Sequence, residues 1–207
     1  MAEQRIGLLG GTFDPIHLGH LLLAVHSYEE LDLDRVIFIP ARRPPHKGHP
    51  AAGAAQRLQM VRLAVANDER FLVCDCEINR TTPSYTIDTV RELQQSLGSE
   101  TQLFWLIGSD MLEDLPTWRK VNELVDMIDI VVVQRAGQPP ADFSALRPSL
   151  AVEQINRIQG HAIEVPLIGV SSTMVRERIA QGLSLRHFVP ESVEKYITEN
   201  KLYQQQK

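Results

Sequence analysis

The sequence has 207 residues, of which 43% are hydrophobic and 23% are charged. This composition is ordinary for a globular protein, and the length predicts a single well-buried domain over residues 1–207. The formal net charge of -5 excludes a general electrostatic attraction to nucleic acid or to an anionic membrane surface. Any anionic ligand must therefore be held by a local cluster of positive charge.

The N-terminal segment and the cysteines indicate a cytoplasmic location. Met1 to Arg5 leads directly into an apolar stretch and carries no signal-peptide pattern. The longest apolar stretches, such as residues 129–133, have the length of a strand and are too short to span a membrane. We expect Cys74 and Cys76 to be buried thiols in a reducing compartment, because positions two apart on a strand are too distant for a relaxed disulfide.

Short apolar stretches alternate along the chain with longer amphipathic segments. In chain order, the pattern predicts a strand at 5–10, a helix at 18–31, a strand at 35–41, a proline-rich loop at 42–53, a helix at 54–66, a strand at 71–78, a helix at 84–97, a strand at 102–107, a helix at 118–127, a strand at 128–134, a surface excursion at 136–160, a strand at 162–167 and helices at 172–181 and 190–203.

This alternation is typical of the α/β class. It predicts a doubly wound, mainly parallel sheet with right-handed crossovers, on which the C-terminal helical part, about residues 170–207, packs. In such sheets ligands bind at the carboxyl ends of the strands. Gly10 and Gly108 both follow apolar strand segments, so the binding site is expected there.

The segment from Gly10 to His20 has the sequence Gly-Gly-Thr-Phe-Asp-Pro-Ile-His-Leu-Gly-His. Its first two glycines follow a predicted strand and let the backbone approach a phosphate closely. Asp14 before Pro15 indicates a helix cap and first turn, whose free N–H groups attract an anion. His17 and His20 then share a face and can donate hydrogen bonds to a phosphoryl group in the transition state. The alternative is two partly exposed histidines with no function.

The segment from Gly169 to Arg176 has the sequence Gly-Val-Ser-Ser-Thr-Met-Val-Arg. Its hydroxyl residues precede a predicted helix, so they can cap it and offer its N–H groups to an anion. Arg176 follows Ser172 by four residues and is expected to point back to the same end. A Ser-Ser-Thr cap alone is common and purely structural. Together with the Gly10–His20 segment, it predicts the second part of a phosphate-binding site.

The densest positive cluster lies between Arg42 and Lys47, in the sequence Arg-Arg-Pro-Pro-His-Lys. Its prolines restrict the backbone, so the side chains are presented with little freedom to lose. We interpret His46 and Lys47 as contacts to a triphosphate or to a substrate phosphate. The alternative is a solvated basic loop.

These segments resemble the two signatures of the nucleotidyltransferase superfamily. Residues 17–20 resemble its T/H-x-G-H motif, and residues 170–176 resemble I-S-S-T-x-x-R with Val170 in place of isoleucine. The resemblance implies a Rossmann-like fold and transfer of a nucleoside monophosphate from a triphosphate, with release of pyrophosphate. It implies three catalytic residues, namely His17, His20 and Arg176. It also implies an ATP site made of Gly10, Gly11, Thr12, His17, His20, Lys47, Asp110, Ser172, Thr173 and Arg176.

A further set of segments resembles the nicotinate-nucleotide adenylyltransferase family. Residues 83–86 open a predicted helix, 108–110 end a strand, 115–118 follow it, and Arg135 ends the next strand. The resemblance implies that Thr86 and the backbone near Trp118 receive a pyridine carboxylate, while the Trp118 indole stacks on the pyridine ring. Both roles are physically sensible, because a helix N-terminus attracts an anion and an aromatic plane covers a flat heterocycle. The implied substrate-binding residues are His46, Thr86, Trp118 and Arg135.

Alternatives remain for the two tryptophans. Trp118 can instead be a core aromatic residue on an amphipathic helix, and Trp105, on a predicted strand, is expected to be simply packed. Asp110 resembles the acid that contacts the nucleoside in this family.

The resemblance covers nearly the whole chain and implies a step of NAD biosynthesis. The phosphate of nicotinate mononucleotide attacks the α-phosphorus of ATP in line, giving deamido-NAD and pyrophosphate, and no covalent enzyme intermediate is needed. Mg²⁺ is expected to bridge triphosphate oxygens, and the sequence indicates no dedicated metal ligands. The expected partners are ATP and nicotinate mononucleotide, without nucleic acid or membrane.

Other functions remain open at this point. Pantetheine-phosphate adenylyltransferase shares the first signature, although that family is shorter and lacks the segments around Thr86 and Trp118. A cytidylyltransferase would carry a later Arg-Thr-Glu-Gly motif, which is not seen. A catalytically silent nucleotide sensor on the same fold is the alternative from another class. The preference between nicotinate and nicotinamide mononucleotide, a homo-oligomeric state, the order of binding and the motion of the 42–47 loop are also left open.

Overall fold

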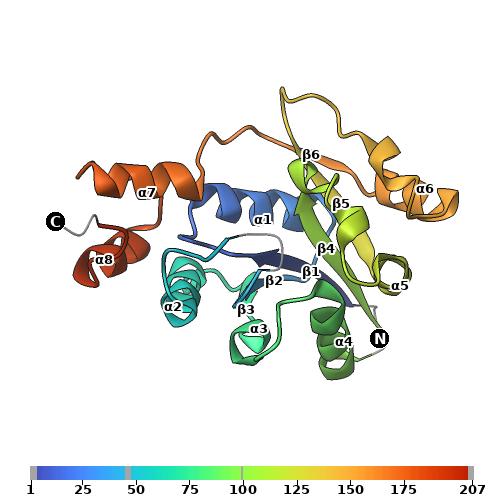
Figure 1. Ribbon diagram of the computed structural model, residues 1–207, viewed down its shortest axis with the longest axis horizontal. Helices are drawn as coiled ribbons and strands as arrows, with labels where there is room; N and C mark the ends of the chain where they lie inside the picture. Colours follow the sequence, from blue (N-terminus) through green and yellow to red (C-terminus); the bar gives the residue numbers. More distant parts are fainter. Residues whose placement is uncertain (1–3, 45–47, 99, 205–207) are drawn as a thin grey trace.

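A computed structural model describes residues 4–44, 48–98 and 100–204 of the chain (Figure 1). In this part of the chain, six strands form one sheet in the order β3-β2-β1-β4-β5-β6, and every pairing is parallel. The strands are β1 (Gln4–Gly11), β2 (Arg35–Pro40), β3 (Phe71–Val73), β4 (Thr101–Gly108), β5 (Asp129–Arg135) and β6 (Ile163–Val165). The predicted α/β class with a doubly wound parallel sheet is confirmed.

Helices connect the strands and follow the last one. The α-helices among the described residues are α1 (Leu18–Glu30), α2 (Ala54–Val65), α3 (Cys76–Asn79), α4 (Thr86–Leu97), α5 (Val121–Met127), α6 (Val152–Gly160), α7 (Ser172–Ala180) and α8 (Glu191–Glu199). Short 3-10 helices are η1 (Ser109–Met111), η2 (Leu115–Thr117) and η3 (Phe143–Leu146). Most boundaries fall within two residues of those predicted, which is the usual uncertainty of a helix end.

The strand order changes direction at β1. From β1 the chain runs outward to β2 and β3, and it then returns to β4 on the other side of β1 before continuing outward to β5 and β6. The carboxyl ends of β1 and β4 therefore diverge into connections on opposite sides of the sheet. This is the switch point at which doubly wound sheets bind ligands.

The middle positions of the central strands are apolar and buried because both of their faces are covered. Successive residues alternate between two hydrophobic clusters, with Leu8 and Trp105 in one and Leu9 and Phe104 in the other. The cluster containing Leu9 receives side chains from α1, α2, α7 and α8, and the other receives them from α4, α5 and α6. Each fully buried aliphatic or aromatic side chain contributes about 1.5–3 kcal/mol to folding, so these two layers stabilise the strand ends that carry the site.

The C-terminal helices belong to the same core. Val193 and Ile197 of α8 are buried in the cluster that contains Leu9, and α8 packs beside α2, as Figure 1 shows in red and cyan. We propose from this shared core that the chain forms one domain, with its C-terminal helical part packed against helices that cover the sheet. No helix of the described residues is long and apolar enough to cross a membrane, while the cytoplasmic location stays a prediction.

The strand predicted at 71–78 is too long. β3 is an edge strand that pairs only with β2, and its ladder ends at Val73 with one further bond from the Cys74 N–H to the Phe38 carbonyl. The chain then turns into α3, where the Asn79 N–H donates to the Asp75 carbonyl at 3.1 Å. Cys74 and Cys76 are free thiols that are only partly buried, contrary to the expectation of full burial, and Cys76 lies on α3 instead of on a strand.

The helix predicted at 118–127 starts later, at Val121. Trp118 has extended backbone angles, and Lys120 adopts a left-handed conformation with φ 55° and ψ 43°. Such a residue does not continue a right-handed helix. The prediction failed because the apolar periodicity of α5 was extended backwards past Lys120. Trp118 therefore lies on a loop.

The stretch 136–160, predicted as an irregular excursion, contains η3 and α6. Ile155 and Ile158 of α6 are buried against the sheet, while Val152 is 66% exposed. The Gln154 side chain accepts a hydrogen bond from the Ala151 N–H at 3.0 Å and caps the helix. Val152, Ile155 and Ile158 recur at helical spacing, so the prediction failed because the irregular, proline-containing pattern before residue 150 was extended over the whole stretch.

Candidate active site

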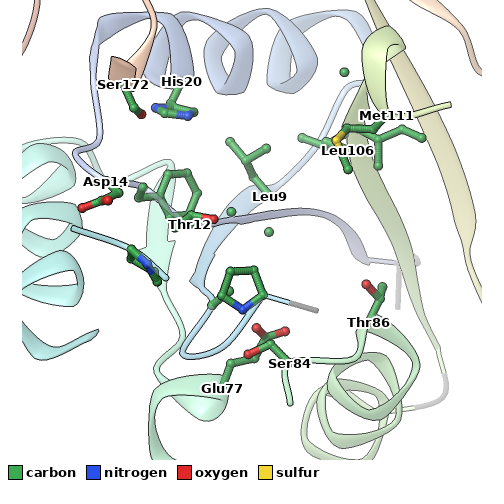
Figure 2. Close-up of a pocket in the computed structure, with 18 of the residues that line it drawn as sticks. Leu9, Thr12, Asp14, His20, Glu77, Ser84, Thr86, Leu106, Met111 and Ser172 are labelled. Carbon is green, nitrogen blue, oxygen red and sulfur yellow. The ribbon is translucent and has the colours of Figure 1, made fainter. Parts of the chain in front are cut away.

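A cavity of about 660 Å³ opens at the carboxyl ends of β1 and β4, at the switch point of the sheet (Figure 2). This volume is typical of a small-molecule site. Its lining includes nearly all of the predicted site residues that the structure describes, namely Gly10, Gly11, Thr12, His20, Thr86, Asp110, Trp118, Arg135, Ser172, Thr173 and Arg176. Figure 2 shows His20 and Ser172 at one end and Thr86 at the opposite end.

Three of the predicted residues are not in this lining. His17 is 6% exposed and lies behind His20. His46 and Lys47 lie outside the described residues, so their predicted phosphate contacts stay predictions. Arg42, from the same basic cluster, directs its guanidinium to the carbonyls of Ile78 at 3.3 Å and Arg80 at 3.2 Å. This arginine therefore anchors the loop instead of facing the cavity.

The two glycines that end β1 are required by ring packing. A Cβ atom at Gly10 would lie 2.6 Å from the Trp105 indole, and one at Gly11 would lie 2.9 Å from the Phe13 ring. The close approach of these rings is a reason for glycine that the sequence did not suggest. Trp105 is buried, as expected for a packed strand residue, and it also reaches the cavity wall.

The first helix is capped differently from the prediction. Its N-cap is His17, with extended backbone angles, and Asp14 before Pro15 lies outside the helix. The Asp14 carboxylate instead accepts hydrogen bonds from the Ala51 N–H at 2.7 Å and the Ala52 N–H at 3.0 Å. Asp14 was misassigned because an acidic residue before proline is typical of a cap, whereas here its partners come from a distant loop.

The two histidines form a stacked pair at the start of α1. Their ring centroids are 3.8 Å apart with an interplanar angle of 30°, and the His17 N–H donates to Nδ1 of His20 at 3.3 Å. An imidazole that accepts at Nδ1 carries its proton on Nε2 when it is neutral. Burial, with the nearby Arg135 charge as a smaller cause, lowers the pKa of His17 to about 4. His17 is therefore a neutral residue near pH 7.

Replacing His17 by asparagine is expected to flatten the pH dependence of stability between pH 4 and 6.5. The unfolded chain binds a proton at His17 over this range while the folded protein does not, so the stability contribution is complete above pH 6.5 and lost as the pH falls to about 4. The loss amounts to about 3 kcal/mol. Urea unfolding at several pH values measures it, and an unchanged slope in the variant would contradict the assignment.

The N-terminus of α7 is attached to the loop that precedes α1. The Ser172 hydroxyl donates to the Pro15 carbonyl at 2.9 Å, and the Arg176 guanidinium donates to the Asp14 carbonyl at 2.7 Å and to Oγ1 of Thr173 at 3.2 Å. Ser171 is the N-cap, and its side chain accepts from the Met174 N–H. The two signature segments, far apart in sequence, therefore meet at one end of the cavity with a helix N-terminus and a guanidinium.

Arg57 is a structural residue of the site that the sequence did not indicate. It lies on α2, is only 1% exposed, and donates to the carbonyls of Thr12 at 2.5 Å, Ala52 at 3.2 Å and Arg42 at 3.3 Å. It thus joins the loop after β1 to the two ends of the 42–53 loop. In the sequence it is one of two arginines on this helix, and arginines are usually exposed.

The opposite end of the cavity begins at the N-terminus of α4, where Thr86 is the first helical residue. The Trp118 ring lies edge-on to Trp105, with centroids 6.5 Å apart. The buried Nε1 of Trp118 has no hydrogen-bond partner within the described ranges. An aromatic wall therefore stands beside a helix N-terminus, as the resemblance implied for a pyridine ring and its carboxylate.

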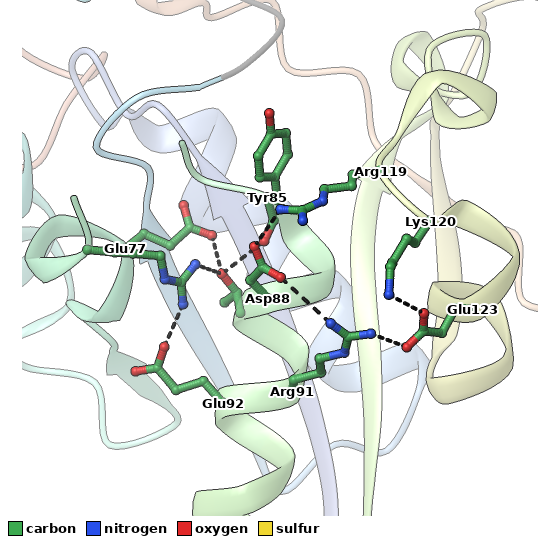
Figure 3. A network of polar contacts seen from close by, with 10 residues as sticks. Glu77, Tyr85, Asp88, Arg91, Glu92, Arg119, Lys120 and Glu123 are labelled. Atoms are coloured by element: carbon green, nitrogen blue, oxygen red, sulfur yellow. Dashed lines mark hydrogen bonds and ion pairs between the residues drawn. The ribbon is translucent and has the colours of Figure 1, made fainter. Parts of the chain in front are cut away.

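Ion pairs fix the loop that carries Trp118 to α4 (Figure 3). The Arg119 guanidinium stacks over the Tyr85 ring at 4.8 Å and pairs with Asp88 at 3.2 Å. Glu123 of α5 pairs with Arg91 of α4 and, at 3.0 Å, with Lys120. Individually such exposed pairs are weak, but together they hold the two elements in one arrangement.

Glu77 lines the cavity and is another residue that the sequence did not indicate. It is buried, and Oε1 accepts a hydrogen bond from the Thr89 hydroxyl at 2.7 Å. Burial raises its pKa, although hydrogen bonds from Thr89 and Ser84 act in the opposite direction. Ser84 also accepts from the Arg42 N–H at 3.1 Å, so this chain of contacts holds the start of the 42–53 loop.

The described residues contain no group of three or more His, Cys, Asp or Glu residues that could hold a metal ion. The acidic residues in the cavity lining are Asp14, Glu77 and Asp110. Asp14 and Glu77 are already committed to hydrogen bonds within the protein, which leaves Asp110, at the end of β4, as the exposed carboxylate of this wall.

Comparison with known proteins agrees with this geometry. The cytidylyltransferase-like family profile matches residues 8–178. A protein from Dehalococcoides mccartyi strain 195 named "Probable nicotinate-nucleotide adenylyltransferase" is 42% identical over 207 residues, with 100% of both chains covered. A protein of the same name from Thermus thermophilus is 44% identical, covering 97% of this chain and 100% of that one. Fold, cavity and profile thus define a protein of the cytidylyltransferase-like class. Within this class, the chain belongs to the nicotinate-nucleotide adenylyltransferase family.

Solved structures show the same fold. The Plasmodium falciparum nicotinic acid mononucleotide adenylyltransferase complexed with NaAD has a TM-score of 0.71 and 17% sequence identity, and the match covers 97% of each chain. The same Plasmodium protein complexed with APC has a TM-score of 0.65 with the same coverage. The predicted Rossmann-like fold is confirmed by this likeness.

Proposed function

We propose that the protein transfers the adenylyl group of ATP to nicotinate mononucleotide, giving deamido-NAD and pyrophosphate. The observation that carries the proposal is that one cavity contains both the paired signature segments and the pair of Thr86 and Trp118. The full-length relatives at 42% and 44% identity, named for this reaction, support the same conclusion.

The triphosphate occupies the end of the cavity formed by the two signature segments. There Thr12, His20 and the N-terminus of α7 surround a space with N–H and imidazole donors, and Arg176 supplies a positive charge. A protein with a net charge of -5 needs such a local concentration of donors to hold a polyanion. His17 supports this end from behind, since it stacks on His20 and donates its backbone N–H to it.

The pyridine nucleotide occupies the opposite end. The free N–H groups at the start of α4 receive its carboxylate, and Trp118 covers the ring. Arg119 lines the cavity beside the same helix and stacks on Tyr85, but its charge is balanced by the pairing with Asp88, so the helix N–H groups are the main donors to the carboxylate. These features favour an acceptor with a negatively charged ring substituent over a neutral amide.

The reaction is a direct displacement at the α-phosphorus. An oxygen of the acceptor phosphate forms a bond to this phosphorus, the bond from phosphorus to the oxygen bridging to the β-phosphate breaks, and the electron pair leaves with pyrophosphate. The nucleophile is already an anion near neutral pH, so no general base is required. Positioning and charge neutralisation by His20 and Arg176 are the main contributions of the protein.

Mg²⁺ enters as part of the ATP substrate. The described cavity offers one exposed carboxylate, Asp110, which fits an ion held mainly by triphosphate oxygens and water. The ion neutralises charge on the triphosphate when it is bound. The absence of nucleic-acid partners stays a prediction from the sequence.

Pyrophosphate release with a panel of acceptors tests the proposal. The protein is incubated with ATP, Mg²⁺ and, in turn, nicotinate mononucleotide, nicotinamide mononucleotide or phosphopantetheine, and the dinucleotide product is identified by chromatography. We expect nicotinate mononucleotide to be used at least about tenfold more efficiently than the amide, because the α4 N-terminus pairs with its carboxylate. Turnover with phosphopantetheine but with neither pyridine nucleotide would show that phosphopantetheine is the acceptor and would contradict the proposal. Release with none of the three would favour a nucleotide sensor.

A further inference from the structure

The C-terminal end of the described chain returns to the first signature segment. After α8 ends at Glu199, Lys201 and Tyr203 adopt left-handed conformations with φ 51° and 61°. These turns end the helix that was predicted to run to residue 203. They direct the Tyr203 hydroxyl to the Asp14 carboxylate, where it donates a hydrogen bond to Oδ1 at 2.8 Å across 189 residues of sequence.

Asp14 is a buried carboxylate with three donors. It is 6% exposed, and the Tyr203 hydroxyl and the Ala52 N–H both donate to Oδ1 while the Ala51 N–H donates to Oδ2. A buried carboxylate is costly unless its oxygens are satisfied. Burial and the Asp14 charge raise the pKa of Tyr203, so the phenol stays protonated and remains a donor.

The backbone around Asp14 carries groups of the triphosphate end. The Asp14 carbonyl accepts from the Arg176 guanidinium at 2.7 Å, and the Pro15 carbonyl accepts from Ser172 at 2.9 Å. The position of this loop therefore sets the positions of α7 and of the histidines that follow in sequence. Tyr203 itself is absent from the cavity lining, so its effect on a ligand must pass through Asp14.

We propose that Tyr203 is a positioning residue for adenylyl transfer, which holds the Asp14 carboxylate and, through it, places Arg176 and the loop before α1. This inference rests on the proposed function. The phenol supplies a partly buried donor, and through Asp14 it connects the first signature, residues 51–52 and the C-terminal segment. Because it is outside the two signatures, its role follows only from the three-dimensional arrangement.

The test begins with Tyr203→Phe, which removes the hydroxyl and keeps the ring. We expect kcat to fall about tenfold while KM for ATP changes less than about twofold, because small displacements of the groups that act on the reacting phosphates weaken transition-state contacts most. Tyr196→Phe on α8 is the matched control. Tyr196 packs in the same partly buried layer, no hydrogen bond from its hydroxyl is seen among the described residues, and we expect wild-type kinetics.

A double-mutant cycle with Asp14→Ala tests whether Tyr203 acts through Asp14, because alanine removes the acceptor whereas asparagine would keep it. If Tyr203 acts through Asp14, adding Tyr203→Phe to Asp14→Ala lowers kcat by less than about twofold, because the contact is already lost. Multiplicative effects in the double variant would overturn the proposal. So would unchanged kcat in Tyr203→Phe.

Hydrogen exchange gives a result that does not depend on turnover. In Tyr203→Phe, the amides of Ala51 and Ala52 should exchange faster than in the wild type, while those of β4 should not change. Unchanged exchange at residues 51–52 would contradict the positioning role even if the protein were inactive with every acceptor. Wild-type inactivity together with faster exchange would instead contradict the proposed function and leave the role of Tyr203 in holding the loop supported.

Discussion

Replacement of His20 by alanine is expected to lower kcat by about two orders of magnitude or more. His20 lines the cavity at the triphosphate end, and its ring is oriented by the His17 N–H, which donates to Nδ1, and by edge-on packing on Phe13 at 5.0 Å. The removal of one oriented donor to a developing phosphoryl charge typically costs 10²–10³ in kcat, roughly 3–4 kcal/mol. Steady-state kinetics with ATP and nicotinate mononucleotide measure this effect.

A matched control is His26→Ala. His26 lies on the same helix but outside the cavity lining, so its removal should leave kcat within about twofold of the wild type. Near-normal turnover of His20→Ala would contradict the assignment of His20 to the transition state. A rise in KM with no change in kcat would mean that His20 binds the substrate and the transition state equally well and does not accelerate the chemical step.

Replacement of Arg57 by methionine is expected to lower the free energy of unfolding by about 3–5 kcal/mol. Methionine fills much of the same volume, but the carbonyls of Thr12, Ala52 and Arg42 lose their charged donor in a buried setting. A hydrogen bond to a charged group contributes about 1.5–3 kcal/mol, and an unsatisfied buried acceptor adds a further penalty. Urea unfolding monitored by tryptophan fluorescence provides the measurement.

Arg62→Met, on the same helix, serves as the comparison. Arg62 pairs with Asp75 at 2.9 Å, and its side chain is 50% exposed, so its loss should cost less than about 1 kcal/mol. Equal losses of unfolding free energy in the two variants would mean that the buried hydrogen bonds of Arg57 add nothing to the stability of the protein. Because Arg57 holds the Thr12 carbonyl in the cavity wall, we also expect weaker ATP binding in Arg57→Met at temperatures where the variant is folded.

The regular parts of the sheet could be predicted because their pattern is local. Strands buried on both faces are recognisable as continuous apolar stretches, and the helices between them repeat with their own period, so β1, β2, β4 and β5 were located within two residues. Parallel pairing and the position of the site then follow from general rules of connection. The meeting of the two signature segments, here the contacts of Ser172 and Arg176 with Pro15 and Asp14, is a consequence of that topology.

The errors arise where a single residue or a distant partner decides the conformation. The left-handed Lys120 ends the backward extension of α5, and it places Trp118 on a loop at the cavity. Cys76 turns into α3 because the edge strand has no further ladder to join. Neither change of conformation can be predicted from the periodicity of apolar residues, because that periodicity is an average over several residues.

Parts of the site were beyond prediction for a related reason. Arg57 and Glu77 are ordinary charged residues in sequence, and their roles arise from carbonyls and hydroxyls brought together by folding. The misassigned Asp14 shows the same limit, since its donors come from Ala51, Ala52 and Tyr203. A pattern in one sequence reports neighbours along the chain, while the contacts of Asp14 join residues 37–189 positions apart.

The contacts between the first signature and the C-terminal third also bear on how the protein is made in the cell. Synthesis proceeds from the N-terminus, so the loop at Asp14 and Pro15 leaves the ribosome long before Ser172 and Arg176, which are 157 and 162 residues further along. The earlier strands can pair as they emerge, since domains generally begin to fold during synthesis. The loop receives its last partners only when α7 and then Tyr203 have been translated, so a stalled nascent chain that ends before α7 contains the strands of the sheet but no completed triphosphate site.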